Sequence, residues 1–259
     1  MSDKSDSNEI SREELDEMIN NAGPLLLANR NLKRADLVGV DLSRADLRGA
    51  DLYKANLRGA DLARADLSDA DLGKADLSAA RLLGARLQEA YLNHANLSEA
   101  NLEAADLHNA ALRRVNLRKA NLARANLHGA DLKGADLHGA KLRWSSLHKS
   151  NLDSALNVSD KWQLVWDILA HGGSGRDLRG TKLARANLSG ADLSGANLYR
   201  VDLSEAILRD ANLREANLTK ANLEKADLAG ADLRGAILTN TKLKGASLTD
   251  AQLDNHNHV

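Results

Sequence analysis

Leucine recurs at every fifth position along most of this 259-residue chain. It does so without exception from Leu32 to Leu152 and again from Leu178 to Leu253. Alanine lies two residues before the leucine in most repeats, and Asp or Asn usually lies between them. Five residues advance an α-helix by about 500°, so these leucines would form no stripe on a helix. The period therefore excludes an amphipathic helix and demands a different repeating unit.

The pentapeptide reads as a short extended side followed by a turn. Alanine and leucine, two residues apart, lie on the same face of an extended segment, and Asp or Asn lies on the other. The two remaining residues are often Gly, Ser, Arg or Lys, which suit an exposed corner. Stacking such units buries a column of Leu and Ala and pairs the backbones at about 4.8 Å per coil.

Repeats such as ADLRG (45–49), ANLRG (55–59), ADLSG (191–195) and ANLYR (196–200) resemble those of the pentapeptide-repeat family. The resemblance covers about four-fifths of the chain. It implies an all-β solenoid, a right-handed quadrilateral parallel β-helix with four pentapeptides per coil. The period alone gives the five-residue side and not the number of sides.

Composition narrows the class of protein further. The 35 Lys and Arg residues nearly balance 36 Asp and Glu, which argues against a general polyanion binder and against a strongly acidic chain. The absence of cysteine excludes disulfides and thiolate chemistry. The polar start MSDKSDSNE shows no secretory signal, and no run of about 18 apolar residues is present. We therefore expect a cytoplasmic protein without a membrane partner.

Two breaks in the period predict the domain organisation. We expect the β-helix in two blocks, with a short N-terminal helix and a short helix between the blocks. The expected segments are a disordered tail plus capping helix (1–24), the first β-helix (25–157), a helical insertion (158–176) and the second β-helix with a polar tail (177–259).

The N-terminal helix is expected within SNEISREELDEMINNAGP (7–24), where Ser11 and Glu14 form a capping box. A lid over the first coil is the simplest role, and a partner-binding helix is the alternative. In the insertion, Ser159 or Asp160 can cap a helix that Gly172 ends. Its expected apolar face is Trp162, Val165, Trp166 and Leu169. Core packing of a lid explains the tryptophans, with a ligand platform as the alternative.

Nothing in the repeats predicts an enzyme or a cofactor. The outward Asp residues alternate freely with Asn, which cannot act as a base. GGSG (172–175) reads as a linker, and no Ser-His-Asp or zinc-ligand spacing stands out. His108, His128 and His148 are 20 residues apart, so four-sided coils would stack them in a ladder that could share a metal ion. A solvated ladder without metal is the simpler expectation.

Two sets of outward residues are candidate partner surfaces. Arg34, Lys54, Lys74 and Arg114 form a basic column that could meet an acidic protein or nucleic acid, or be merely solvated. Acidic residues share its face and aromatic residues are scarce, which disfavours nucleic acid. In the second set, Arg81, Leu83, Arg86 and Tyr91 depart from the repeat, either as a partner-specific patch or as drift on a tolerant surface.

The leading functional hypothesis is a non-enzymatic protein-binding scaffold whose partner the sequence does not identify. The alternative comes from the resemblance, because some family members mimic DNA, bind type II topoisomerases such as gyrase and confer fluoroquinolone resistance. That mechanism requires an acidic rod, whereas the most negative face of the first block carries a net charge of only -2. The last coil (238–253) has no evident cap, so it could pair with a second copy, or the tail HNHV could fold back over it.

Overall fold

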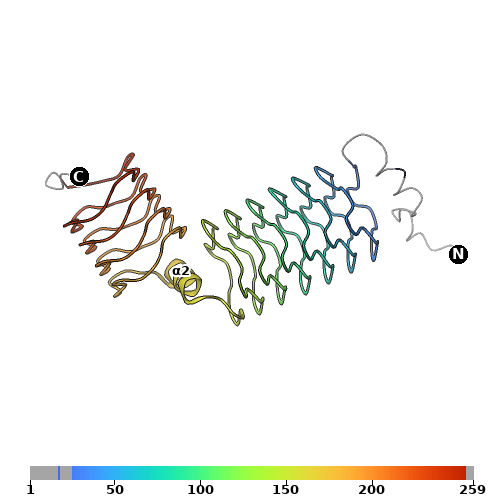
Figure 1. The fold of residues 1–259 in the computed structure, drawn as a ribbon, viewed down its shortest axis with the longest axis horizontal. Helices are drawn as coiled ribbons and strands as arrows, with labels where there is room; N and C mark the ends of the chain where they lie inside the picture. Colours follow the sequence, from blue (N-terminus) through green and yellow to red (C-terminus); the bar gives the residue numbers. More distant parts are fainter. Residues whose placement is uncertain (1–16, 18–24, 255–259) are drawn as a thin grey trace. The chain divides into compact units, whose positions relative to one another are not determined.

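The structure is a computed structural model that describes Glu17 and residues 25–254, and over most of that length the chain forms a β-helix (Figure 1). Parallel bridges join residues that are 20 apart, such as Asp46 with Asp66 and Asp66 with Arg86. Each coil therefore contains four pentapeptides. The bridges are isolated, because each pentapeptide has only a short extended side before it turns.

The backbone of one repeat, residues 46–50, shows how the coils are joined. The N–H of Leu47 donates to the carbonyl oxygen of Asp66 in the next coil (2.7 Å), and that of Asp46 donates to Leu25 in the preceding coil (2.8 Å). The corner residue Gly49 also donates to the next coil (2.9 Å). Three of the five backbone N–H groups thus bind neighbouring coils.

The other two N–H groups of this repeat close its turn. That of Ala50 donates to the carbonyl oxygen of Leu47 (3.0 Å), and that of Arg48 donates to Oδ1 of Asp46 (3.2 Å). All five donors have acceptors, as a closely packed backbone requires. The second corner residue adopts a positive φ (62° at Gly49), which explains why glycine is frequent there.

The leucines fill the interior, as the period predicted. Every one on the period from Leu32 to Leu152 and from Leu178 to Leu233 is buried, and Leu27 adds one further repeat at the start. The four leucines of the last coil, Leu238 to Leu253, are half-buried. The interior of each stack is therefore lined by leucine and the alanine two residues before it.

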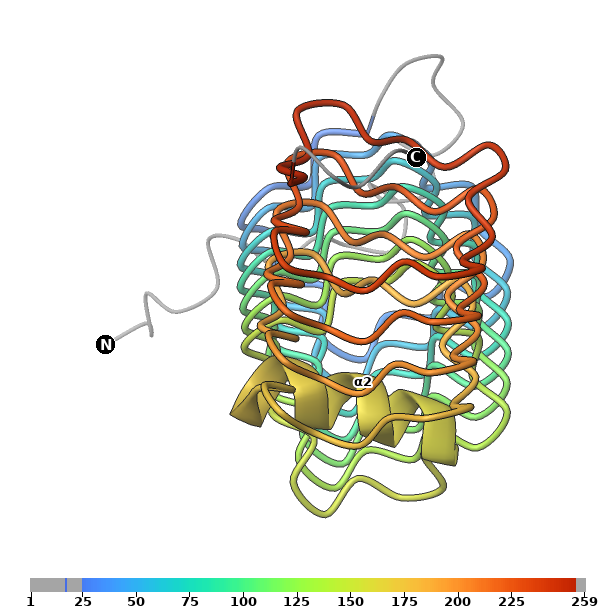
Figure 2. The same cartoon turned by 90° about the vertical axis from the view of Figure 1, so that its left-hand side faces the viewer.

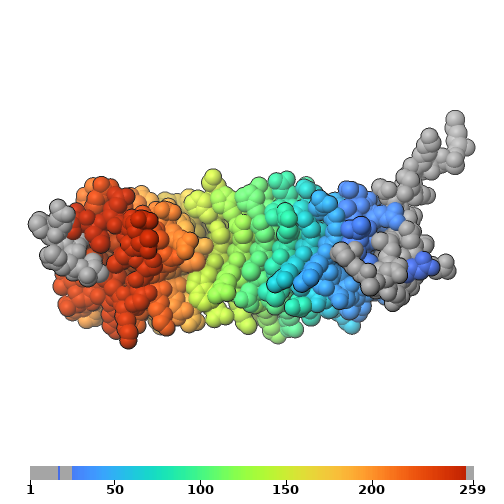
Figure 3. Space-filling view, turned by 90° about the horizontal axis from the view of Figure 1, so that it is seen from above, coloured from blue at the N-terminus to red at the C-terminus, as the bar shows by residue number. Residues whose placement is uncertain are grey.

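The chain divides into two compact units, described here one at a time. Unit 1 contains the described residues up to Leu142 together with Lys149–Val158, and unit 2 contains Arg143–His148 and the chain from Ser159 onward. Within unit 2, Trp144 makes two hydrogen bonds to the first coils. Its backbone N–H donates to the carbonyl oxygen of Arg185 (2.9 Å), and its indole Nε1–H donates to the carbonyl oxygen of Glu205 (2.8 Å). In the space-filling view, the coils within each unit follow one another as bands of successive colour (Figure 3).

Helix α2 (Asp160–His171) precedes the coils of unit 2 and lies across one end of their stack (Figure 2). Ser159 is its N-cap, although its side chain makes no capping hydrogen bond. Gly172 is the C-cap with a φ of 82°, and its N–H donates to Ile168 (2.9 Å). Within the described part of the chain, no helix has the length and apolar character needed to cross a membrane.

The buried face of α2 differs from the expected one. Trp162, Val165 and Ile168 are buried, whereas Trp166 and Leu169 are only half-buried. The helix meets the coils along a narrow stripe, so the side chains at the i, i+3 and i+6 positions are buried and those at the flanking positions are only partly covered. The expected capping helix within residues 1–24, apart from Glu17, and the tail HNHV lie outside the described residues.

Candidate functional site

One corner of unit 1 concentrates basic side chains, and we call it the basic corner. A continuous run of bridges from Asn31 to Asn151 fixes its register, so its members lie in successive coils. It carries seven basic residues against four acidic ones. The basic residues are Lys33, Arg34, Lys54, Lys74, Arg113, Arg114 and Lys133, and the acidic ones are Asp51, Asp71, Asp131 and Asp153.

An aromatic ring lies among the cations in the first half of the basic corner. The ammonium groups of Lys54 and Lys74 are 5.3 and 5.9 Å from the centre of the Tyr53 ring. A Cβ atom at Gly73 would lie 3.1 Å from Cδ2 of Tyr53, so the glycine leaves room for the ring against the next coil. Cation–π attraction of about 0.5–1 kcal/mol at an exposed site helps to hold these lysines in place.

The second half of the basic corner contains a surface hollow of about 640 Å³. Gly134 opens it: the Cβ that any other residue would place there lies 3.3 Å from Cγ of Arg114. The side chains that line the hollow are those of Asn93, His94, Arg113, Arg114, Lys133 and Ser154.

Two departures from the repeat border this hollow. Tyr91 and Ala111 occupy the positions where neighbouring coils carry Asp71 and Asp131. Because Ala111 has no side-chain oxygen, the N–H of Arg113 donates instead to Oδ1 of Asn93 in the preceding coil (2.9 Å). The turn is thus supported without a carboxylate, and the hollow lacks the negative charges that Asp at these two positions would supply.

The cations of the basic corner are unequally neutralised. A hydrogen bond from Lys33 to Asp51 (2.9 Å) raises the pKa of Lys33, and Nε of Arg113 pairs with Asp131. Within residues 25–254, by contrast, no ion pair joins a carboxylate to Arg114 or Lys133, nor to Arg34, Lys54 or Lys74 in the first half. The hollow therefore retains two unneutralised cations.

The second candidate surface does not form one face. Arg81, Arg86 and Tyr91 belong to three different columns of bridges and lie on successive sides of one coil. Each arginine reaches a carboxylate of the preceding coil (2.7 and 3.6 Å), and Leu83 is half-buried. Tyr91, with 59% of its surface exposed, belongs to the basic corner.

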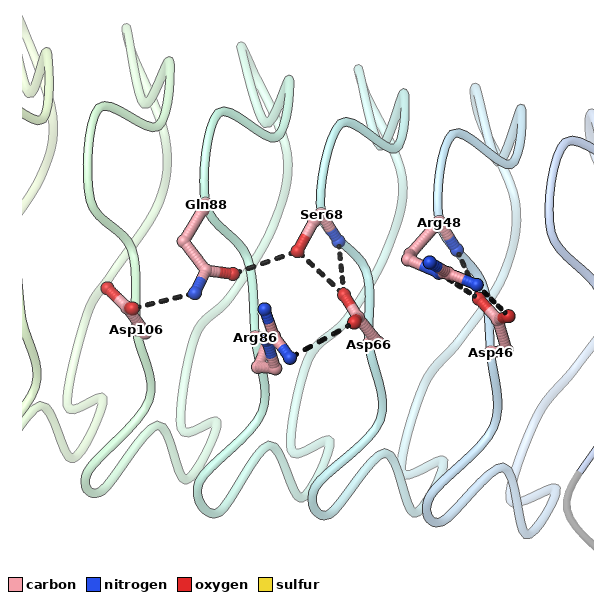
Figure 4. Close-up of polar contacts among 7 residues, drawn as sticks. All are labelled: Asp46, Arg48, Asp66, Ser68, Arg86, Gln88 and Asp106. Atoms are coloured by element: carbon pink, nitrogen blue, oxygen red, sulfur yellow. Dashed lines mark hydrogen bonds and ion pairs between the residues drawn. The ribbon is translucent and has the colours of Figure 1, made fainter.

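The adjacent column, which starts at Leu26, shows the usual role of the outward carboxylates (Figure 4). Arg48 donates to both oxygens of Asp46 (2.8 and 2.7 Å), and this interaction lowers the pKa of Asp46. Gln88 joins Ser68 (2.8 Å) to Asp106 (2.7 Å) across three coils. These groups are occupied in holding turns and coils together, which is a structural role.

The histidine ladder is formed in part. The rings of His108 and His128 stack with their centres 5.1 Å apart, and His148 belongs to unit 2. The described residues contain no group of three or more His, Cys, Asp or Glu side chains placed to hold a metal ion.

Sequence reasoning identified the basic column but not its hollow. The signal was available, since Gly134 stands where the preceding coils carry Arg114, His94 and Lys74. Once the register of 20 residues is known, a glycine in a column of long side chains indicates a depression.

A regular β-helix whose outer positions vary defines a solenoid repeat protein, and the comparisons with known proteins agree. A family model described as "Pentapeptide repeats" matches in eight copies that together cover more than half of the chain. The matches fall within residues 27–69, 45–84, 60–98, 80–118, 110–148, 177–210 and 211–250. The chain belongs to the pentapeptide-repeat family, as the sequence indicated.

Several solved structures are similar to the chain. HetL, a pentapeptide repeat protein involved in heterocyst differentiation regulation from the cyanobacterium Nostoc sp. strain PCC 7120, is 33% identical over 92% of this chain and 93% of its own, with a TM-score of 0.32. Rfr23 from the cyanobacterium Cyanothece 51142 is 32% identical over 55% and 66% of the two chains, with a TM-score of 0.20. QnrB1, a plasmid-mediated fluoroquinolone resistance protein, is 18% identical over 85% and 92%, with a TM-score of 0.18. No curated protein matches the chain.

Proposed function

We propose that this protein is a non-enzymatic scaffold that binds another protein, with the basic corner of unit 1 as the contact surface. The hollow beside Arg114 and Lys133 carries this proposal, because it combines cations that have no ion pair within residues 25–254 with two positions, Tyr91 and Ala111, that carry neither Asp nor Asn. A rigid backbone that fixes the spacing of charged residues avoids the cost of ordering a loop on binding.

The roles of the outward polar residues support a scaffold rather than an enzyme. Side chains such as Asp46 and Asp106 accept hydrogen bonds from turns and from neighbouring coils. A general base would instead need a carboxylate free to take a proton from a substrate.

We further infer the detailed geometry from the family. It comprises a right-handed quadrilateral β-helix in two blocks, 25–157 and 177–259, the second including a polar C-terminal tail, with α2 between them in the sequence. Four pentapeptides in each 20-residue coil support the four-sided section.

DNA mimicry with gyrase binding is less well supported. QnrB1 shares the fold, but its 18% identity extends no functional argument to this chain. Seven basic against four acidic residues in the basic corner would repel a surface that is made to bind DNA.

The test is affinity capture with the full chain from extracts of the native cell. Wild-type protein is compared with the double variant Arg114→Gln/Lys133→Gln and with the matched control Arg44→Gln/Arg64→Gln, which removes two exposed arginines from another corner of unit 1. We expect a protein partner that the first variant loses and the control retains. Capture of no protein, or equal capture by all three, would contradict the proposal.

A further inference from the structure

We infer that the hollow of the basic corner binds carboxylate side chains of an extended acidic segment in the partner protein. This inference rests on the proposed function and names the chemistry of the partner. It is carried by the side chains around the hollow and by the two places where the repeat loses its carboxylate.

The hollow offers donors suited to carboxylates. Arg114 and Lys133 are exposed, and within residues 25–254 neither is paired with an acidic residue. The guanidinium of Arg113 uses its Nε for Asp131, and an arginine has five N–H donors in all. Arginine binds carboxylates through two parallel hydrogen bonds, which are about twice as strong as neutral ones.

The departures at Tyr91 and Ala111 make this part of the column different from the rest. In the first half of the corner the column carries Asp51 and Asp71, and Asp51 pairs with Lys33. Tyr91 and Ala111 carry no carboxylate, and Asn93 supports the turn that follows Ala111. Of the carboxylates that remain in this half, Asp131 pairs with Arg113, and within residues 25–254 no ion pair joins Asp131 or Asp153 to Arg114 or Lys133.

The dimensions suit a short segment. From Lys33 to Lys133 the corner crosses five coil spacings, which is about 24 Å. An extended peptide of about seven residues covers that distance. Tyr91, 59% exposed on the same side, adds an aromatic contact of the kind found at the centre of protein interfaces.

The surroundings favour an acidic peptide over nucleic acid. Nucleic-acid affinity depends on many phosphate contacts, whereas the cations of the basic corner are interspersed with four carboxylates, those of Asp51, Asp71, Asp131 and Asp153. The adjacent column carries five acidic residues against three basic ones, which would repel a long polyanion. The acidic residues are Asp46, Asp66, Asp69, Glu89 and Asp106, and the basic ones are Arg48, Arg86 and Lys149.

The most specific test of charge at the hollow is a substitution towards the residue that the repeat prefers. Ala111→Asp restores the side chain that the repeat prefers, so the coil should fold, yet it places a carboxylate beside the hollow. Ala111→Asn restores the same hydrogen-bonding oxygen without the charge. The pair therefore separates the effect of charge from any change in the turn.

The experiment measures binding of a fluorescein-labelled octaglutamate peptide to the full chain by fluorescence anisotropy, at low salt and then near 1 M salt. We expect wild-type binding that Ala111→Asp and Arg114→Gln/Lys133→Gln weaken by about tenfold or more. Ala111→Asn and Arg44→Gln/Arg64→Gln should change it by less than about twofold. High salt should abolish it, because the screening length falls to about 3 Å.

Three results would overturn the inference: no wild-type binding at low salt, equal loss in the Arg44→Gln/Arg64→Gln control, or tighter binding of a labelled octathymidine strand than of the peptide. The capture experiment tests the scaffold proposal separately from the acidic-segment inference. If capture yields a protein that depends on Arg114 and Lys133 while octaglutamate does not bind, the acidic-segment inference fails and the scaffold stands.

Discussion

The Asp or Asn that precedes each leucine supports the turn that follows it. Its Oδ1 accepts the N–H two residues ahead, which either amino acid can do, and this explains why the two alternate. In several repeats Asn adds a second bond, because its amide donates to the preceding coil. In one such ladder, Asn96 donates to Asp76 (3.0 Å) and accepts from Asn116 (3.0 Å) and from the N–H of Ser98 (3.2 Å).

Asn96→Asp should therefore destabilise the protein at pH 7. The variant keeps the acceptor oxygen, loses the donor to Asp76 and places two carboxylates in adjacent coils. We expect a loss of about 1–2 kcal/mol in the free energy of unfolding, measured by urea denaturation. Repulsion raises the pKa of the introduced carboxyl in the folded state, so part of the loss should be recovered as the pH falls towards 4.

Asn187→Asp is the matched control. Asn187 supports its own turn through the N–H of Ser189 (3.2 Å), and its bridge partner in the next coil is Ile207. The substitution should change stability by less than about 0.5 kcal/mol. Equal losses for the two variants would show that the ladder between coils contributes nothing.

Asp232 provides a residue-level test of the surface ion pairs. Two hydrogen bonds from Arg234 (2.9 and 2.6 Å) lower the pKa of Asp232 to about 2. The stability from this depressed pKa is present above about pH 4 and is lost as the pH falls towards 2. In Arg234→Gln, an NMR titration of the carboxyl should show the pKa moving up towards its ordinary value. An unchanged pKa would mean that the ion pair is not formed in solution.

At the level of elements, α2 covers the first coil of unit 2 through a close approach at Gly173. The N–H of Gly173 donates to the backbone carbonyl oxygen of Asp192 (2.8 Å), so Gly173 already belongs to the hydrogen-bonded ladder of coils. A Cβ atom there would lie 2.7 Å from Cδ2 of Leu193 and 3.4 Å from Cγ2 of Ile168. Glycine is needed because the helix and the coil meet where a side chain would stand.

Gly173→Ala should destabilise unit 2 by about 1–3 kcal/mol, because the added methyl overpacks this junction. The three tryptophans all belong to unit 2, so their fluorescence during urea denaturation reports on it. The clash with Leu193 predicts coupling: Gly173→Ala should cost less in a Leu193→Ala background than in the wild type. Additive effects would count against the close approach.

Whether the sequence could predict a contact depends on whether that contact is made by periodic side chains or by backbone groups and neighbouring coils. Leucine positions predicted the core, because apolar burial depends on the period and little else. The supporting role of Asp46 was missed, since its partner is a backbone N–H that no motif reveals. The hollow depends on Gly134, Arg114 and Asn93 meeting across coils, and the five-residue period does not fix which coils meet.

Prediction from the sequence was limited in the same way for helix α2, which lies between the two runs of repeats in the sequence. The end of α2 at Gly172 followed from the sequence, since glycine suits a C-cap. Its buried face did not, because helical spacing alone could not choose Ile168 over Leu169. That choice is made by the surface on which the helix packs.

On the scale of the whole molecule, each unit is a stack in which a coil contacts only its neighbours. Leu208, Leu228 and Leu248 occupy one column of unit 2 in successive coils. Leu208 is completely buried, with coils on both sides, whereas Leu248 lies in the last coil and is half-buried. The same side chain at the same position in the repeat should therefore contribute differently along the stack.

Leu208→Ala should cost about 2–5 kcal/mol, because the layers on both sides prevent the cavity from closing. Leu248→Ala should cost less than half as much, since its side chain already contacts water and the last coil can relax. Tryptophan fluorescence during urea denaturation measures both, because both leucines and all the tryptophans belong to unit 2. Equal costs would mean that another surface covers the last coil in solution, and a dependence of the Leu248→Ala cost on protein concentration would identify that surface as a second copy of the chain.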